Sequence, residues 1–192
     1  MQRSRFLIHL LSFHFTLAAF ATDGPRDAVV LIIRHAEKPD FGIGLAPRGQ
    51  QRAEAYKRYF RKFAVDATPL RLDAIFASSD SKKSQRSRLT VEPLARAAKL
   101  EVNTRFRTEE AKGLADEVRA TQRGKCVLIC WHHGDVPDLL REFGVKPRRL
   151  LPDGEWPDPV FDWVIQMRFD AKGRLIPAQT MRIPEHLLPG DF

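Results

Sequence analysis

Cysteine is scarce in this sequence, which contains only Cys126 and Cys130 among its 192 residues. Two cysteines are too few for a disulfide framework or for a zinc site with four cysteine ligands. Long hydrophobic runs are missing beyond the amino terminus, and the mean hydropathy of −0.34 excludes a protein with many membrane spans. The sequence also lacks repeats, low-complexity tracts and linkers, which predicts a single domain over residues 22–192.

The amino terminus carries the longest apolar stretch. Arg3 and Arg5 precede an apolar run over residues 6–20, which ends in the small-x-small triplet of residues 19–21. This order predicts a secretory signal peptide over residues 1–21, and therefore a secreted or periplasmic protein with no membrane contact after cleavage. This run is too short for a membrane-spanning helix, which needs about 20 residues. An uncleaved anchor is the alternative.

Acidic residues are in the minority, with 24 Asp and Glu against 32 Lys and Arg and a formal net charge of +8. Such an excess of positive charge usually serves only to keep a protein soluble. Where the charges gather at one site, they favour an anionic partner. The densest basic stretch, residues 82–88, contains no aromatic side chain on which a base can stack. We therefore expect no nucleic-acid partner.

The apolar pattern predicts an α/β domain. Continuous apolar runs over residues 28–33, 72–77 and 126–131 are typical of buried parallel strands. Helical patterns lie between them, over residues 47–63, 84–100 and 109–119. This order predicts three layers, with a mostly parallel central sheet flanked by helices. In the proline-rich last third, residues 160–169 and a shorter strand near residues 175–183 are expected to form a hairpin at a sheet edge.

Histidines gather where two of these strands end. After the signal peptide only four histidines remain; His35 follows the first predicted strand, and His132 and His133 follow the strand over residues 126–131. Parallel sheets place ligand sites beyond the carboxyl ends of their strands. His132 and His133 are adjacent on a strand, so their side chains are expected to point to opposite faces and cannot easily share an ion. We therefore expect a site without a metal.

An anion-binding segment follows the predicted strand over residues 72–77. The small hydroxyl residues Ser78 and Ser79 lead into a helix that carries Arg86 near its amino end. Helix amino termini attract anions, and arginine suits bidentate contact with phosphate oxygens. A capped, solvated helix start is the structural alternative for this segment.

Four segments in this order resemble the histidine phosphatase superfamily, the phosphoglycerate mutase-like fold. They are Arg34-His35-Ala36-Glu37 after a strand, and residues 45–53, 86–95 and 127–134. The resemblance runs from about residue 28 to 143. It implies a metal-independent phosphatase without cofactors, acting on a small phosphorylated substrate or a phosphopeptide; it does not predict an oligomeric state. A phosphomutase, or a non-catalytic module that binds phosphorylated ligands, is the alternative.

The resemblance also implies residue roles. His35 matches the nucleophilic histidine, Arg34 the arginine before it, Arg86 the second phosphate-binding arginine and His133 the second histidine of the phosphate pocket. A neutral imidazole attacks phosphorus to give a phosphohistidine, while arginines neutralise the phosphoryl oxygens. Further candidates are Glu37, Lys38 and Ser79 for substrate binding, and Glu109, Glu110 and Asp135 for the proton donor.

Overall fold

A computed structural model describes residues 24–191 of the chain, so the predicted signal peptide over residues 1–21 lies outside the described residues. One sheet has the strand order β5-β4-β6-β1-β7-β8. Its strands are β1 (Val29–Arg34), β4 (Ala74–Ala77), β5 (Val102–Asn103), β6 (Cys126–Trp131), β7 (Trp163–Arg168) and β8 (Met181–Pro184). Strands β5, β4, β6 and β1 are parallel, whereas β7 and β8 run antiparallel to their neighbours.

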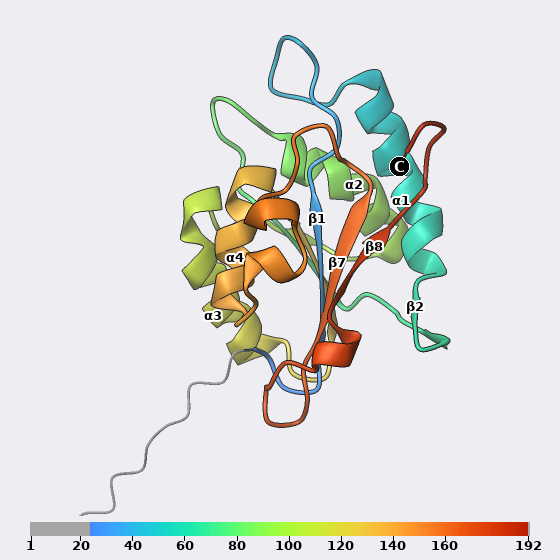
Figure 1. Cartoon of the computed structure of the whole chain (residues 1–192). Helices are drawn as coiled ribbons and strands as arrows, with labels where there is room; N and C mark the ends of the chain where they lie inside the picture. Colours follow the sequence, from blue (N-terminus) through green and yellow to red (C-terminus); the bar gives the residue numbers. More distant parts are fainter. Residues whose placement is uncertain (1–23, 192) are drawn as a thin grey trace, which may run out of the picture.

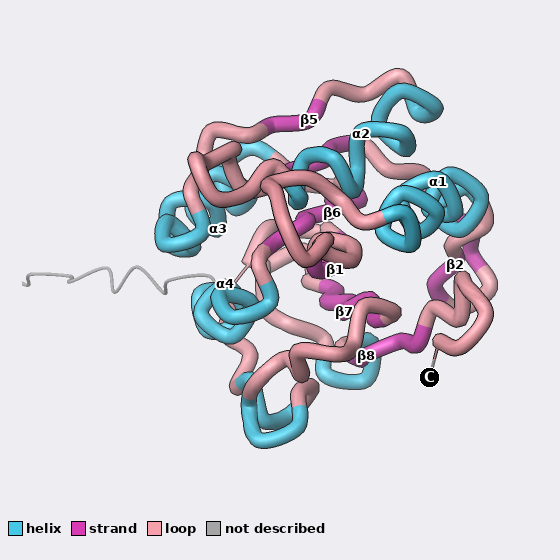
Figure 2. Tube along the Cα trace, turned by 90° about the horizontal axis from the view of Figure 1, so that it is seen from above, coloured by secondary structure: helices cyan, strands magenta, loops and turns pink. Residues whose placement is uncertain are grey.

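Helices cover both faces of the sheet (Figures 1 and 2). They are α1 (Pro47–Arg61), α2 (Arg86–Ala98), α3 (Ala111–Thr121) and α4 (Val136–Glu142). Helices α1 and α2 pack on one face and α3 and α4 on the other, in two separate apolar clusters. None of the helices within residues 24–191 combines the length and the apolar character that a membrane span needs.

The apolar runs in the sequence explain this layering. In β1, Leu31 and Ile33 belong to the cluster under α1 and α2, while Val30 and Ile32 belong to the cluster under α3 and α4. A strand with both faces covered needs apolar residues at every position, because successive side chains alternate between the two faces. The predicted three-layer α/β fold with a mostly parallel sheet is therefore confirmed.

Several element ends differ from the predicted ones. Helix α1 stops at Arg61 rather than at residue 63, because the chain turns into the hairpin of β2 (Ala64–Val65) and β3 (Thr68–Pro69). The residues of that turn, Asp66 and Ala67, have φ angles of +50° and +62°, a conformation that suits a tight hairpin. Helix α3 starts at Ala111 instead of residue 109, after a 3-10 turn over Thr108–Glu110.

The carboxyl-terminal third forms the predicted edge hairpin, in which β7 pairs antiparallel with β8. The second strand begins only at Met181, because Pro177 opens a 3-10 turn over Pro177–Gln179 and interrupts the ladder. Helix α4 was not predicted from the pattern. It is short and has a proline at its start, Pro137, where the missing N–H leaves no helical hydrogen bond unmade.

Candidate active site

Three strand ends bring the predicted site residues together. In the parallel pairing of β1, β4 and β6, Arg34 lies opposite Trp131, and Ala77 lies opposite Cys130. The residues that follow these strands therefore meet at one edge of the sheet. The backbone N–H of His35 continues the ladder by donating to the carbonyl of Trp131 at 3.0 Å.

His35 is a buried, neutral imidazole. Its side chain Nδ1 lies 2.8 Å from the carbonyl oxygen of Ala36, and since a carbonyl only accepts, Nδ1 carries the ring proton. Nε2 is then left with a free lone pair. Burial lowers the pKa of His35 to about 3, and the charges of Arg34 and Arg86 act in the same direction. The ring is consequently uncharged at neutral pH and has the form that a nucleophile requires.

A threonine in α2 fixes the loop that carries His35. The hydroxyl of Thr90 accepts the backbone N–H of Ala36 at 2.8 Å and donates to the carbonyl of Arg86 at 2.7 Å. Thr90 is completely buried. This pair of bonds holds the amino end of α2, and with it Arg86, beside the residue that follows His35.

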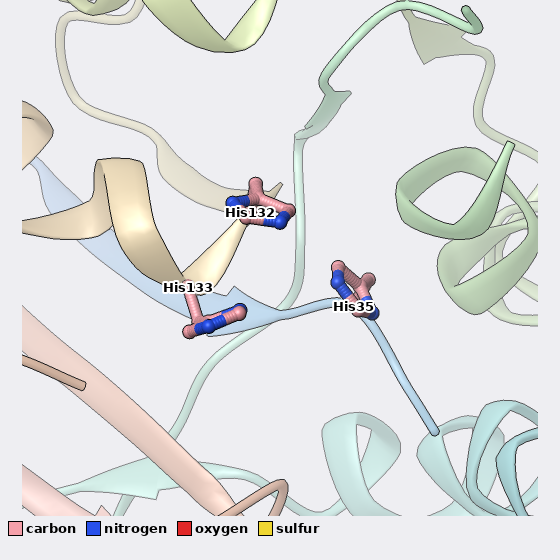
Figure 3. Close-up of side chains that lie close together, drawn as sticks. All are labelled: His35, His132 and His133. Atoms are coloured by element: carbon pink, nitrogen blue, oxygen red, sulfur yellow. The ribbon is translucent and has the colours of Figure 1, made fainter. Parts of the chain in front are cut away.

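His132 and His133 lie close together, and the expectation that their side chains point to opposite faces was wrong. Strand β6 ends at Trp131, and His133 begins a 3-10 turn over His133–Asp135, so the alternation of a strand does not apply. The two rings are 4.6 Å apart between centroids, and they lie 5.5 and 6.2 Å from the ring of His35. The three rings surround one small space (Figure 3).

The ring of His133 carries its proton on the other nitrogen. Nη2 of Arg34 lies 3.2 Å from Nδ1 of His133, and because arginine only donates, Nδ1 accepts and Nε2 holds the hydrogen. Nε2 lies 3.4 Å from a carboxylate oxygen of Asp158. Burial, followed by the charge of Arg34, lowers the pKa of His133 to about 4. His35 thus presents a lone pair to the site, whereas His133 presents an N–H.

Arg34 is largely committed to the loop before β7. Its Nη1 donates to the carbonyls of Pro157, Asp158 and Val160 at 3.2, 2.7 and 2.8 Å. The guanidinium also stacks 3.9 Å from the ring centre of Phe161. Burial lowers the pKa of Arg34 to about 10, which still leaves it charged at neutral pH. Only Nη2 is directed to His133, and it lies 3.7 Å from the carboxylate of Asp158.

Arg86 has more hydrogen-bonding capacity to spare. It is the first residue of α2, and its Nη1 makes one long contact of 3.5 Å with the carbonyl of Lys83. Within residues 24–191, its buried Nε has no hydrogen-bond partner. Burial also lowers the pKa of Arg86. A buried donor without a partner is stabilised by an incoming acceptor, which agrees with the predicted anion-binding role.

Two of the three predicted proton donors are paired away from the histidine cluster. Glu109 and Glu110 both pair with Arg107 at 3.2 Å, and their side chains are 62% and 43% exposed. The carboxylate of Asp135 lies 3.0 Å from Nδ1 of His132. The structure therefore brings only Asp135 of these three into direct contact with a histidine of the cluster.

The three predicted substrate-binding residues have different surroundings. Glu37 accepts from Arg52 at 2.7–3.1 Å and pairs with Arg48 at 3.2 Å, so it ties the His35 loop to α1. Lys38 is exposed, and its positive charge contributes to lowering the pKa of His133. Ser79 is half-buried and donates its backbone N–H to the carbonyl of Phe106.

Sequence reasoning missed Asp158. Its side chain is 67% exposed and contacts both Arg34 and His133. It lies in a proline-rich loop without periodicity, far from the strand-end motifs, and its neighbours offer no chemical pattern. No signal in the sequence points to it.

Comparison with known proteins gives matches in structure only. No family model matches the sequence, and no curated protein matches it. Among solved structures, an α-ribazole phosphatase from Shigella flexneri covers 85% of this chain and 99% of its own, with a TM-score of 0.53 and 12% identity. A phosphoglycerate mutase from Plasmodium falciparum covers 86% and 96%, with a TM-score of 0.53 and 11% identity. A phosphoserine phosphatase mutant from Entamoeba histolytica, in complex with phosphoserine, covers 80% and 96%, with a TM-score of 0.52 and 11% identity.

The chain has the histidine phosphatase fold. The resemblance inferred from the motifs is thereby confirmed at the level of the fold. In this fold, Arg34, His35 and His133 lie at the carboxyl ends of β1 and β6, and the charge of Arg86 at the start of α2 acts on His35.

Proposed function

We propose that the protein is a phosphatase that hydrolyses a phosphomonoester through a phosphohistidine on His35. The observation that carries the proposal is the pair of opposite tautomers at the site. The buried His35 offers an unprotonated Nε2, while the half-buried His133 offers an N–H, and both lie beside the positive charge of Arg34. A lone pair for phosphorus and a donor for a phosphoryl oxygen are the two groups that the reaction needs.

The proposed reaction has two steps. Nε2 of His35 attacks phosphorus, the bond to the leaving oxygen breaks, and that oxygen takes a proton to depart as an alcohol. A water molecule then attacks phosphorus and gives a proton to the carboxylate that protonated the alcohol, the nitrogen–phosphorus bond breaks, and inorganic phosphate leaves. Throughout, the N–H of His133 and the guanidinium groups of Arg86 and Arg34 face the phosphoryl oxygens and stabilise their charge. These steps use no cofactor.

Asp158 is the proton donor in this proposal. Its carboxylate lies 3.4 Å from Nε2 of His133 and 3.7 Å from Nη2 of Arg34, the groups assigned to the phosphoryl oxygens. A carboxylate at these distances stands where an anionic oxygen of a substrate is expected. When a phosphoryl group takes this place, the exposed side chain of Asp158 is displaced toward the leaving group, within reach of the bridging oxygen.

Rapid-quench mass spectrometry tests the central step. We expect an acid-labile phosphoryl adduct on His35 during turnover of phosphorylated metabolites or phosphopeptides. His35→Ala should abolish both adduct and turnover, while His186→Asn, away from this cluster, should keep both. An adduct on another residue, or turnover that survives in His35→Ala, would refute the assignment.

A non-catalytic module for phosphorylated ligands is the second candidate. The observation that favours it is that Nη1 of Arg34 is already saturated by three carbonyls, while Glu109 and Glu110 are paired with Arg107. Such a module binds phosphorylated ligands without forming an adduct. A phosphomutase, in contrast, forms the adduct and passes the phosphoryl group to a second hydroxyl, so the ratio of released phosphate to isomerised product separates the two enzymes.

A further inference from the structure

The proposed phosphatase chemistry uses two of the three clustered histidines and leaves His132 without a role. We propose that His35, His132 and His133 together bind one divalent transition-metal ion of the Zn²⁺ type, which blocks the nucleophile. The site would be a reversible inhibitory site, occupied in competition with the phosphorylated substrate.

The spacing of the rings fits a single ion. One nitrogen from each histidine lies within 4.8 Å of the other two. Bonds of about 2.0–2.1 Å to zinc place ligand nitrogens about 3.4 Å apart in a tetrahedral site. The widest pair therefore has to close by about 1.4 Å at most. The side chains of His132 and His133 are 39% and 21% exposed, so in this proposal the closure comes from rotation of these two rings.

Two of the three rings already have the outer partners typical of metal ligands. Nδ1 of His35 donates to the carbonyl of Ala36, and Nδ1 of His132 lies 3.0 Å from the carboxylate of Asp135. Histidine ligands usually donate their second nitrogen to a carbonyl or carboxylate, which leaves Nε2 for the ion. Phosphoryl transfer gives His132 no role, whereas the contact with Asp135 orients its ring as that of a metal ligand.

His133 has to change its tautomer. Its proton moves from Nε2 to Nδ1 when Nε2 coordinates, and the contact between Nδ1 and Nη2 of Arg34 is lost. Arg34 keeps its position because its three bonds to loop carbonyls run through Nη1. The change therefore removes two contacts of His133, the one from Nδ1 to Arg34 and the 3.4 Å contact from Nε2 to Asp158, and leaves the loop in place.

The charges around the cluster determine which ions are suitable. Arg34, Arg86 and Lys38 oppose a cation, whereas Asp135 and Asp158 favour it. Only an ion that forms strong bonds to imidazole overcomes this balance, which selects Zn²⁺ or Cu²⁺ over Mg²⁺ and Ca²⁺. Three histidines leave one coordination position open, as in zinc sites with three protein ligands.

The inhibitory consequence rests on the proposed function, whereas binding of the ion does not. A metal ion on Nε2 of His35 uses the lone pair that attacks phosphorus. Turnover then falls with the fraction of protein that holds the ion, and rising substrate or phosphate displaces it.

Calorimetric titration of the untagged, chelator-treated protein with Zn²⁺ tests the site directly. We expect one ion per chain, and an affinity that falls at least tenfold in His132→Ala and in His35→Ala. His186→Asn is the matched control, because His186 lies outside the cluster and its φ of +48° suits asparagine. Circular dichroism establishes that each variant is folded, and His132→Gln replaces His132→Ala if the latter is not.

Two further readouts complete the test. Co²⁺ in place of Zn²⁺ should give the intense visible absorption of a four-coordinate site in the parent and lose it in His132→Ala, and Mg²⁺ should give no heat. The proposed site would be refuted if the parent and the His132→Ala variant bound Zn²⁺ equally, or if the parent bound none. If Zn²⁺ binds and turnover is unaffected, the inhibitory role fails while the metal site holds. Absence of any turnover refutes the proposed function and leaves the calorimetric result intact.

Discussion

Replacing His35 with glutamine is expected to change how the stability of the protein depends on pH. Burial is the main reason that the pKa of His35 falls from the ordinary value of 6.5 to about 3. Below pH 6.5 the unfolded chain binds a proton at this histidine, but the folded chain does not until the pH approaches 3. The contribution of the neutral His35 ring to the free energy of unfolding is therefore fully present above pH 6.5. It is lost as the pH decreases toward the folded pKa.

The size of the effect follows from the shift. Each unit of pKa difference corresponds to about 1.36 kcal/mol. Between pH 7 and pH 5, the histidine takes up most of its proton in the unfolded chain but almost none in the folded chain. The free energy of unfolding of the parent should therefore fall by about 2 kcal/mol through His35 alone. His35→Gln does not titrate and loses none of this contribution. The pKa of His133, about 4, belongs to both proteins and cancels in the comparison.

Urea unfolding at pH 7 and pH 5 provides the measurement. Trp131 and Trp156 are buried, so their fluorescence reports the transition. We expect the free energy of unfolding of the parent to fall by about 2 kcal/mol more than that of His35→Gln, which corresponds to a difference of roughly 4–8 °C in the shift of Tm. Equal losses in the two proteins would show that His35 titrates normally in the folded state, and that the ring is not held as a neutral nucleophile.

Three other substitutions address single contacts of the site. Thr90→Val removes the acceptor of a buried N–H and should lower the free energy of unfolding by about 1–3 kcal/mol, measured by denaturation, whereas Thr90→Ser should retain most of it. Arg86→Lys should lower kcat/KM at least about tenfold in steady-state assays, because an ammonium does not replace a bidentate donor; parental activity would move the anion site elsewhere. Asp158→Asn should slow hydrolysis of alkyl phosphates much more than that of p-nitrophenyl phosphate, whose leaving group needs no proton, and an equal effect on both substrates would remove its role as acid.

The parts of the fold that were predictable are those determined by side-chain pattern. Strand β6 has the predicted bounds and β1 is shifted by one residue, because a short, continuous apolar run is typical of a strand that is covered on both faces. The position of His35 follows from the end of that first run. Helix α4 escaped prediction because seven residues with a proline at the start show too little periodicity.

The site was less predictable where backbone geometry decides it. The neighbouring rings of His132 and His133 depend on whether the strand continues past Trp131, which no apolar pattern shows. The hold of Arg34 on residues 157–160 depends on carbonyl oxygens, which every sequence supplies equally. Asp158 enters the site only because that hold exists.

A loop held by its carbonyls can exchange side chains without losing its anchor. Arg34 binds the backbone of Pro157, Asp158 and Val160, so replacing any of these side chains leaves the anchor in place. What the loop presents to a ligand is thereby independent of what holds it. Asp158 is the proton donor in the proposed function and Val160 packs against the apolar core, so Pro157 and Pro159 are the positions at which this loop can change what it presents to a ligand without disturbing the histidine cluster.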